Sequence, residues 1–172
     1  LTRSVRDSAA MLDCLSGPDA GSPYTSIASG ASFLNACQET CKPLRVAYSK
    51  DALYGADNHP DCVEAVEKTV RLLQDLGHTV TEDKPDFDSH QLARAYLQIV
   101  CAWVAWEINE SAKKAKRKPQ ASDFELTTWV MGLVGSKNSG ADLASAMAAC
   151  HQAGRMMGEF HHHYDLFLTS TV

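Results

Sequence analysis

The chain has 172 residues, of which 45% are hydrophobic and 22% are charged, a balance typical of a globular protein that is long enough to bury a core. Its net charge of −5 argues against a nucleic-acid-binding protein, whose binding surface would be basic. The stretches between charged residues and prolines are too polar to span a bilayer, so we expect neither a nucleic-acid partner nor a membrane partner.

The first 43 residues predict one helix followed by a long loop. Ser4 is placed to cap a helix over residues 5–16 by accepting a hydrogen bond from the backbone N–H of Asp7, whose carboxylate could reach back to Ser4. Gly17 and Pro18 are expected to end this helix. Residues 17–43 are rich in Gly, Pro, Ser and Asp, which predicts a surface loop with room for one short helical turn.

Residues 44–81 predict a strand, a helix and a second strand. The first strand is the β-type run from Leu44 to Tyr48. The helix starts at Pro60, is closed by Gly77, and has apolar residues at three-and-four spacing: Val63, Val66, Val70, Leu73 and Leu76. A strand over residues 78–81 follows. This order of elements predicts a βαβ unit whose two strands are parallel.

Three more helices and a final strand are predicted in the rest of the chain. The first of these helices runs from about Ser89 to Lys116 and has a wide apolar face formed by Leu92, Tyr96, Leu97, Val100, Trp103, Val104 and Ile108. A capping box over residues 122–125 predicts a helix that continues to Leu133. The last helix, over about 141–162, leads into a buried strand over 164–170. The predicted fold class is therefore α/β, with a mixed sheet of three or more strands flanked by about five helices.

The six cysteines favour a reduced, cytoplasmic protein. Four of them fall on predicted apolar helix faces, where a thiol packs as a small hydrophobic group: Cys14, Cys62, Cys101 and Cys150. Cys37 and Cys41 lack the second ligand pair of a zinc site, although a disulfide between them is possible. Successive side chains of the histidines 161–163 would point about 100° apart on a helix, so they cannot share one ion without other ligands. We therefore expect no metal and no cofactor.

Two stretches could contact a ligand. The basic residues 113–118 suggest phosphate binding, but cations at the end of a helix also complement its dipole, and we favour that explanation. Aromatic and small polar residues on two neighbouring helices are candidates for the wall of a substrate pocket: Cys101, Trp103, Thr127, Thr128 and Trp129. Tryptophan on an amphipathic helix is more often a core residue, so both interpretations stay open for these positions.

Several segments resemble the amidase signature family. Residues 1–9, LTRSVRDSA, are similar to its L-T-R-S-V-x-D-x-A segment, and residues 44–49 resemble the strand after its variable loop. Residues 59–66, HPDCVEAV, resemble the start of a family helix, and residues 160–171 resemble its F-x-x-Y-D segment and the strand that follows. These pieces occur in family order over nearly the whole chain. Ser170 departs from the family, which usually has proline there.

The resemblance implies an enzyme that hydrolyses C–N amide bonds through a serine acyl-enzyme, using a Ser–Ser–Lys triad. In the family the Gly/Ser-rich catalytic loop precedes the segment that residues 1–9 resemble, so we expect no catalytic residue in this chain. Thr127 and Thr128 stand where the amidotransferase branch has arginine, which favours a neutral aryl or alkyl amide over glutamine. The expected partners are a small-molecule amide substrate and, as a possibility, a second copy in a homodimer.

The chain would then be the central-to-late segment of one larger amidase domain, with no internal boundary. We expect it to be inactive by itself and to expose apolar helix faces that the rest of the domain covers. Two alternatives remain from the sequence: a self-contained, non-enzymatic α/β binding module, and an amidase relative that has lost catalysis. The reading frame upstream of Leu1 would distinguish these alternatives.

Overall fold

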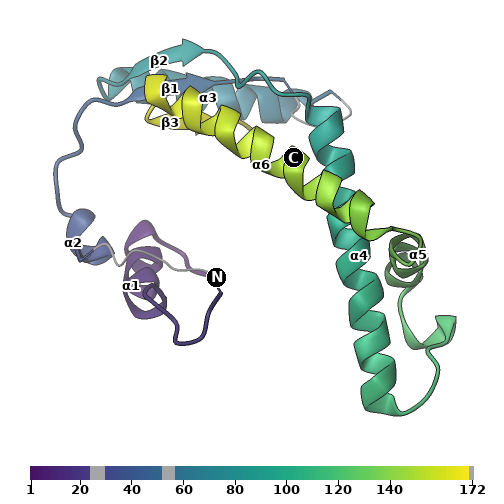
Figure 1. The fold of residues 1–172 in the computed structure, drawn as a ribbon. Coiled ribbons are helices and arrows are strands. Elements are labelled where there is room, and N and C mark those ends of the chain that lie inside the picture. The colour runs from purple at the N-terminus through teal and green to yellow at the C-terminus, as the bar shows by residue number, and fades with distance from the viewer. Residues whose placement is uncertain (24–29, 52–56, 171–172) are drawn as a thin grey trace. The chain divides into compact units, whose positions relative to one another are not determined.

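The computed structural model describes residues 1–23, 30–51 and 57–170. By their internal contacts the residues form two compact units, 1–42 and 43–172, which are described separately below (Figure 1). The described residues include six α-helices, where about five were expected. The additional helix is the short turn that the sequence allowed within the long loop.

The first unit consists of α1 (Val5–Leu15) and α2 (Phe33–Ala36). The predicted cap of α1 is confirmed, because the Ser4 Oγ accepts a hydrogen bond from the backbone N–H of Asp7 at 3.1 Å. Asp13, near the end of α1, accepts hydrogen bonds from the backbone N–H of Phe33 at 2.6 Å and from the Ser32 hydroxyl at 2.7 Å. The Ser32 hydrogen bond contributes most to lowering the pKa of Asp13 below its ordinary value. One carboxylate of α1 thus caps the four-residue helix α2.

The second unit is built on a sheet of three parallel strands. These are β1 (Arg45–Tyr48), β2 (Thr79–Glu82) and β3 (Leu166–Leu168), in the order β2-β1-β3. Val46 pairs with Val80 and with Leu166, so the predicted parallel pairing of the βαβ unit is confirmed. The sheet was expected to be mixed, whereas all the described strands pair in parallel. Val46 in the central strand is only 1% exposed.

The last strand is less buried than the sequence suggested. Leu166 is 49% exposed, and Phe167 and Leu168 are half-buried. The prediction of a buried strand is wrong at this position, because β3 lies at an edge of the described sheet and pairs only with β1 there.

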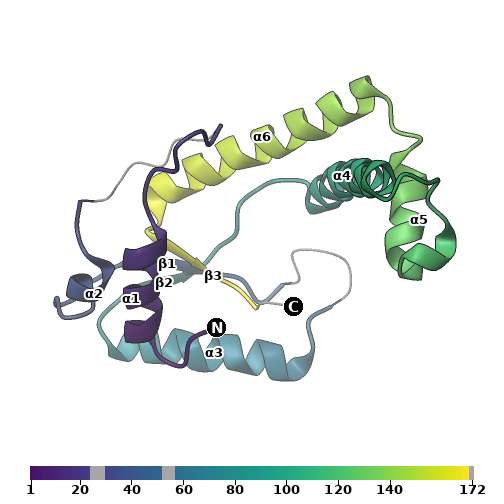
Figure 2. The same cartoon turned by 90° about the horizontal axis from the view of Figure 1, so that it is seen from below.

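Helices lie on both faces of the sheet (Figure 2). On one face, α3 (Pro60–Asp75) begins at Pro60 as predicted and buries Val66 and Val70. On the other face, α6 (Gly140–His163) contacts the sheet near its C-terminus, where the ring of Phe160 lies 5.4 Å from that of Phe167. The prediction of a sheet flanked by helices is confirmed.

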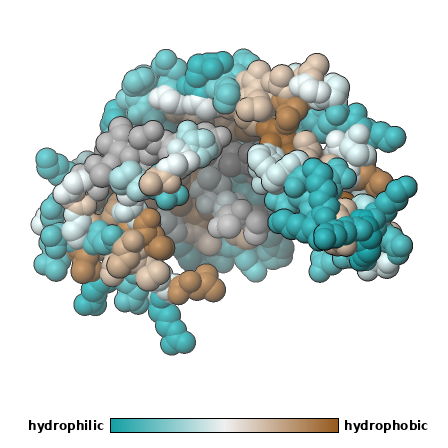
Figure 3. Space-filling view, turned by 60° about the horizontal axis from the view of Figure 1, so that its bottom comes forward, coloured by the Kyte–Doolittle hydropathy of each residue, from teal (hydrophilic) through white to brown (hydrophobic). Residues whose placement is uncertain are grey.

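The longest helix, α4 (Ser89–Ala115), packs against α5 (Leu126–Gly135) and α6 (Figure 1). It buries mainly small side chains: Ala95, Cys101, Ala105 and Ile108. Tyr96, Leu97 and Trp103 belong to the predicted wide apolar face, and each is more than half exposed. The close approach of neighbouring helices selects the face with small residues, so these large side chains remain outside. Other hydrophobic residues also reach the surface of the molecule (brown in Figure 3).

The start of α5 also differs from its prediction. Residues 121–123 form a short 3₁₀-helix (η1), and the capping box is made by Gln120 and Asp123, not by Ser122 and Glu125. Arg117 holds Asp123 through two hydrogen bonds of 2.6 and 2.7 Å, which fixes this turn. The helix α5 therefore begins at Leu126, after an extended Glu125.

A carboxylate joins the beginnings of β1 and β3. Asp165 accepts hydrogen bonds from the backbone N–H of Arg45 at 2.8 Å and from its guanidinium at 2.9 and 3.3 Å. The guanidinium also donates to the carbonyl of His162, the penultimate residue of α6. The Arg45 side chain is the main reason that the pKa of Asp165 falls from 3.8 to about 2. Arg117 lowers the pKa of Asp123 to about 2 in the same way.

The lowered pKa values of Asp123 and Asp165 predict that the folded protein becomes less stable in acid. A carboxylate whose pKa is lower in the folded protein stabilises it fully above the unfolded pKa, and this stability is lost as the pH falls through the folded pKa. The urea midpoint should therefore decrease between roughly pH 4 and pH 2. The variant Asp165→Asn should have a lower midpoint at pH 5 and a flatter pH dependence. If the urea midpoint depended on pH equally in the variant and in the original protein, a stabilising role for Asp165 would be contradicted.

Candidate functional site

The helices α4 and α5 approach each other closely at two glycines of α5. A Cβ atom added to Gly135 would overlap the backbone carbonyl of Cys101, and one added to Gly132 would overlap the end of the Ile108 side chain. Both glycines are buried. The absence of side chains at these positions thus determines how the two helices meet, and with it the shape of the surface beside them.

A groove of about 410 Å³ lies between α4 and the segment that contains η1 and α5. Its volume is within the range of ligand pockets. The residues that line it come from both sides: Val100, Trp103, Val104, Glu107, Ile108, Ser111, Phe124 and Thr128. We refer to it below as the α4–α5 groove.

Two rows of α4 side chains form one side of the α4–α5 groove. Residues four positions apart lie on the same face of a helix, one turn above the other. One row is entirely apolar and consists of Val100, Val104 and Ile108, whereas the other changes in character along the helix from Trp103 through Glu107 to Ser111. The opposite side is supplied by Phe124 and Thr128. The groove therefore combines an apolar lining with a carboxylate and two hydroxyl groups.

The predicted pocket residues divide into two groups. Trp103 and Thr128 line the α4–α5 groove together, although they come from different helices. Cys101 is 2% exposed, at the contact between α4 and Gly135, and Thr127 is exposed; neither lines the groove. Trp129 also lies outside the lining, but its ring stacks on that of Phe124 at 6.0 Å and thus supports one wall.

Sequence reasoning missed Glu107, Ser111 and Phe124 as groove residues. A signal for the first two was present, because Trp103, Glu107 and Ser111 follow one another at intervals of four on a predicted helix. Phe124 carried no comparable signal, since the segment around it was assigned to a capping box that forms elsewhere.

The electrostatics of the α4–α5 groove depend on Glu107. Among the described residues, Glu107 takes part in none of the ion pairs. The described lining has no histidine, lysine or cysteine that could act as a general base or nucleophile. The groove can hold an apolar group and provide a negative charge beside it, but its lining offers no machinery for hydrolysis.

A second hollow, of about 340 Å³, lies on the other side of Trp103. It is lined by Ala102, Trp103, Trp106 and Leu143, so it has no charged residue. The two indole rings meet edge to face with centroids 5.3 Å apart, and Trp103 and Trp106 are 60% and 50% exposed. This surface is a hydrophobic patch between α4 and α6.

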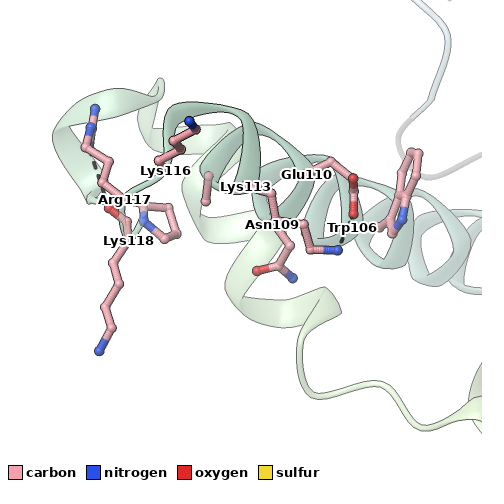
Figure 4. Close-up of a pocket in the computed structure, with 9 residues that line it drawn as sticks. Trp106, Asn109, Glu110, Lys113, Lys116, Arg117 and Lys118 are labelled. Atoms are coloured by element: carbon pink, nitrogen blue, oxygen red, sulfur yellow. Dashed lines mark hydrogen bonds and ion pairs between the residues drawn. The ribbon is translucent and has the colours of Figure 1, made fainter.

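A third hollow, of about 720 Å³, lies at the basic end of α4 (Figure 4). Two of its cations are already paired: Lys113 with Glu110 at 2.6 Å and Arg117 with Asp123 at 2.6 Å. Lys116 adopts a left-handed conformation with φ of 53° and ends the helix. Two of the four lining cations are thus neutralised by carboxylates, and the terminal carbonyl groups of α4 add negative charge, which favours the solvated helix end over a phosphate site.

The histidines and cysteines considered as metal ligands or disulfide partners lie within the described residues. His161 contacts the carbonyl of Tyr164 through its Nδ1 at 3.0 Å, and the described residues contain no cluster of three metal-binding side chains. All six cysteines are within the described ranges and are free there, Cys37 and Cys41 included. In residues 1–23, 30–51 and 57–170, no helix is both long and apolar enough to cross a bilayer.

Comparisons with known proteins identify the family of this chain and its fold. The sequence profile of the Amidase family matches residues 1–172. The chain is 26% identical to a lipoamidase from Enterococcus faecalis, over 74% of the chain and 18% of that enzyme. It is 27% identical to the 6-aminohexanoate-cyclic-dimer hydrolase of Pseudomonas sp. (strain NK87), over 99% of the chain and 35% of that enzyme.

A solved structure of 6-aminohexanoate cyclic dimer hydrolase, complexed with substrate, has the same fold. It superposes with a TM-score of 0.82 and 24% sequence identity, covering 92% of this chain and 33% of that protein. The chain thus spans about a third or less of the length of these relatives.

Proposed function

Because this chain belongs to the Amidase family, we propose that it is part of an amidase that hydrolyses C–N amide bonds through a serine acyl-enzyme. The match of the family profile to all 172 residues carries this proposal. The curated relatives whose names state an activity on amides or on a cyclic dimer support the reaction class.

We further propose that both compact units belong to one larger amidase domain, whose Ser–Ser–Lys triad lies outside this chain. Relatives that align with almost the whole chain are about three times as long, which leaves ample sequence for a catalytic loop. Exposed large apolar side chains on α4, such as Tyr96, Leu97 and Trp106, fit a segment that other parts of the same domain cover.

The α4–α5 groove is the part of this chain that we propose to contact the substrate. Its lining is mostly apolar and contains no arginine, which suits a neutral aryl or alkyl amide better than the carboxylate of free glutamine. Trp103 and Thr128 would contact the non-reacting arm of the amide. Cys101 would act indirectly, through the contact between α4 and α5 that fixes the groove.

The test is an assay of the full-length protein that contains this chain. We expect it to hydrolyse hexanoyl-p-nitroanilide and similar aryl or alkyl amides, with glutamine a poor substrate. A sulfonyl fluoride should inactivate it and add a single adduct on a serine that lies outside residues 1–172. The isolated chain, checked for folding by circular dichroism, should release no p-nitroaniline above the uncatalysed rate.

Three results would contradict the proposal. A full-length protein that is folded but hydrolyses no amide in the panel would indicate a relative without this activity. An adduct on a serine of this chain, or turnover by the isolated chain, would place the catalytic residues within residues 1–172 and contradict a triad outside them.

A further inference from the structure

We propose that the α4–α5 groove selects a linear apolar substrate arm that ends in a protonated amine, and that Glu107 is the residue that determines this specificity. The inference rests on the proposed amidase function and modifies its substrate class: the substrate remains an alkyl amide, but the far end of its arm is positively charged instead of neutral. It depends on three observations, which concern the length of the groove, its charge and the contrast with the neighbouring hydrophobic patch.

The shape of the groove favours a linear chain. Its apolar row extends over two helical turns from Val100 to Ile108, which corresponds to about 12 Å along the axis of α4. Trp103 of α4 and Phe124, which precedes α5, add aromatic rings to the same lining. Ile108 is only 7% exposed, because α5 covers it at Gly132, whereas Val100 and Val104 are half-buried. An alkyl chain aligned with α4 would therefore contact mainly these two valines and Trp103, and each methylene removed from water would stabilise the complex.

The charge of the groove favours a cation at the end of that chain. Glu107 is the one ionisable residue in the described lining, and it forms no ion pair with the described residues. The nearby cations Lys113 and Arg117 are paired with Glu110 and Asp123, and none of these four residues lines the groove. An ammonium group can therefore pair with Glu107, whereas a carboxylate would be repelled by it.

The hydrophobic patch on the other side of Trp103 gives a contrast within the same helix. Trp106 and Leu143 can be covered by another part of the protein without burying a charge. Glu107 is exposed in this chain, and covering the groove would bury its carboxylate, which is costly in free energy unless a positive charge is buried beside it. The groove is thus suited to a ligand that brings its own positive charge.

Binding to the full-length protein tests this inference directly. In calorimetric titrations, n-octylamine should bind at least tenfold more tightly than n-octanoate, and n-hexylamine should bind more weakly than n-octylamine. The variant Glu107→Gln should lose about tenfold in affinity for the amines, because the charge-assisted hydrogen bond is lost. The control Glu159→Gln removes an exposed carboxylate of α6 outside the groove and should leave both affinities unchanged.

Kinetics provide the second measurement. For amides whose acyl arm ends in an amine, Glu107→Gln should raise KM about tenfold and leave kcat nearly unchanged, since the arm is bound alike in the ground state and the transition state. For acetamide-type substrates without an arm, both constants should stay the same. Equal affinity for octylamine and octanoate, or an unchanged amine affinity in Glu107→Gln, would overturn the inference.

The two proposals fail in different ways. If amides are hydrolysed but the amine preference is missing, the specificity inference is wrong and the amidase proposal stands. If octylamine binds in a Glu107-dependent manner but no amide is hydrolysed, the groove is an amine-binding site and the amidase proposal is wrong.

Discussion

The substitution Gly135→Val is expected to destabilise the protein by about 3 kcal/mol. The added side chain would overlap the backbone carbonyl of Cys101, and a backbone group in the middle of α4 cannot rotate away as a side chain can. The helices α4 and α5 would have to separate, which also removes the buried contacts of Ile108 with α5. The free energy of unfolding, measured by urea denaturation of the full-length protein, provides the test.

A glycine elsewhere in a helix supplies the matched control. Gly154 lies within α6, and a Cβ atom added there would meet nothing within 4 Å. Gly154→Ala should therefore leave the stability unchanged or raise it by about 0.5–1 kcal/mol, because alanine loses less backbone entropy than glycine. A Gly135→Val protein as stable as the Gly154→Ala protein would mean that α4 and α5 do not meet as described.

Filling the groove is expected to change substrate preference strongly. In the full-length enzyme, Thr128→Trp places a large ring in the lining of the groove, on the side opposite Val104 and Trp103 of α4. We expect kcat/KM for long-chain alkyl amides to fall by roughly tenfold to hundredfold, the range over which an apolar pocket discriminates by size. The same constant for acetamide should change little. Steady-state kinetics with an amide series of increasing chain length measure this effect.

The adjacent threonine distinguishes groove filling from a general disturbance of α5. Thr127 is exposed and lies outside the lining, so Thr127→Trp adds the same side chain to the same helix without occupying the groove. Its chain-length preference should match that of the original enzyme. If both variants, or neither, lose long-chain activity selectively, Thr128 does not contact the substrate arm.

Sequence alone was sufficient for features that depend on short-range periodicity and capping. The three-and-four spacing that includes Val66 and Val70 identified α3 and its buried side, and Ser4 identified the start of α1. The strand–helix–strand order predicted the parallel pairing of Val46 with Val80. The resemblance of several segments to the amidase signature family, in family order, also identified the family. Each of these signals involves residues close together in the chain.

Only the tertiary structure decided which residues meet. Arg45 and Asp165 are 120 positions apart, so nothing local indicated that they join β1 to β3. Similarly, the exposed Trp103 and the buried Cys101 both lie on α4, and hydrophobicity alone favoured burial of both. The glycines of α5 selected the side with small residues, because helices can approach closely only where no large side chain intervenes. The sequence determined the elements and the family, whereas close packing between helices determined the groove and placed Glu107 within it.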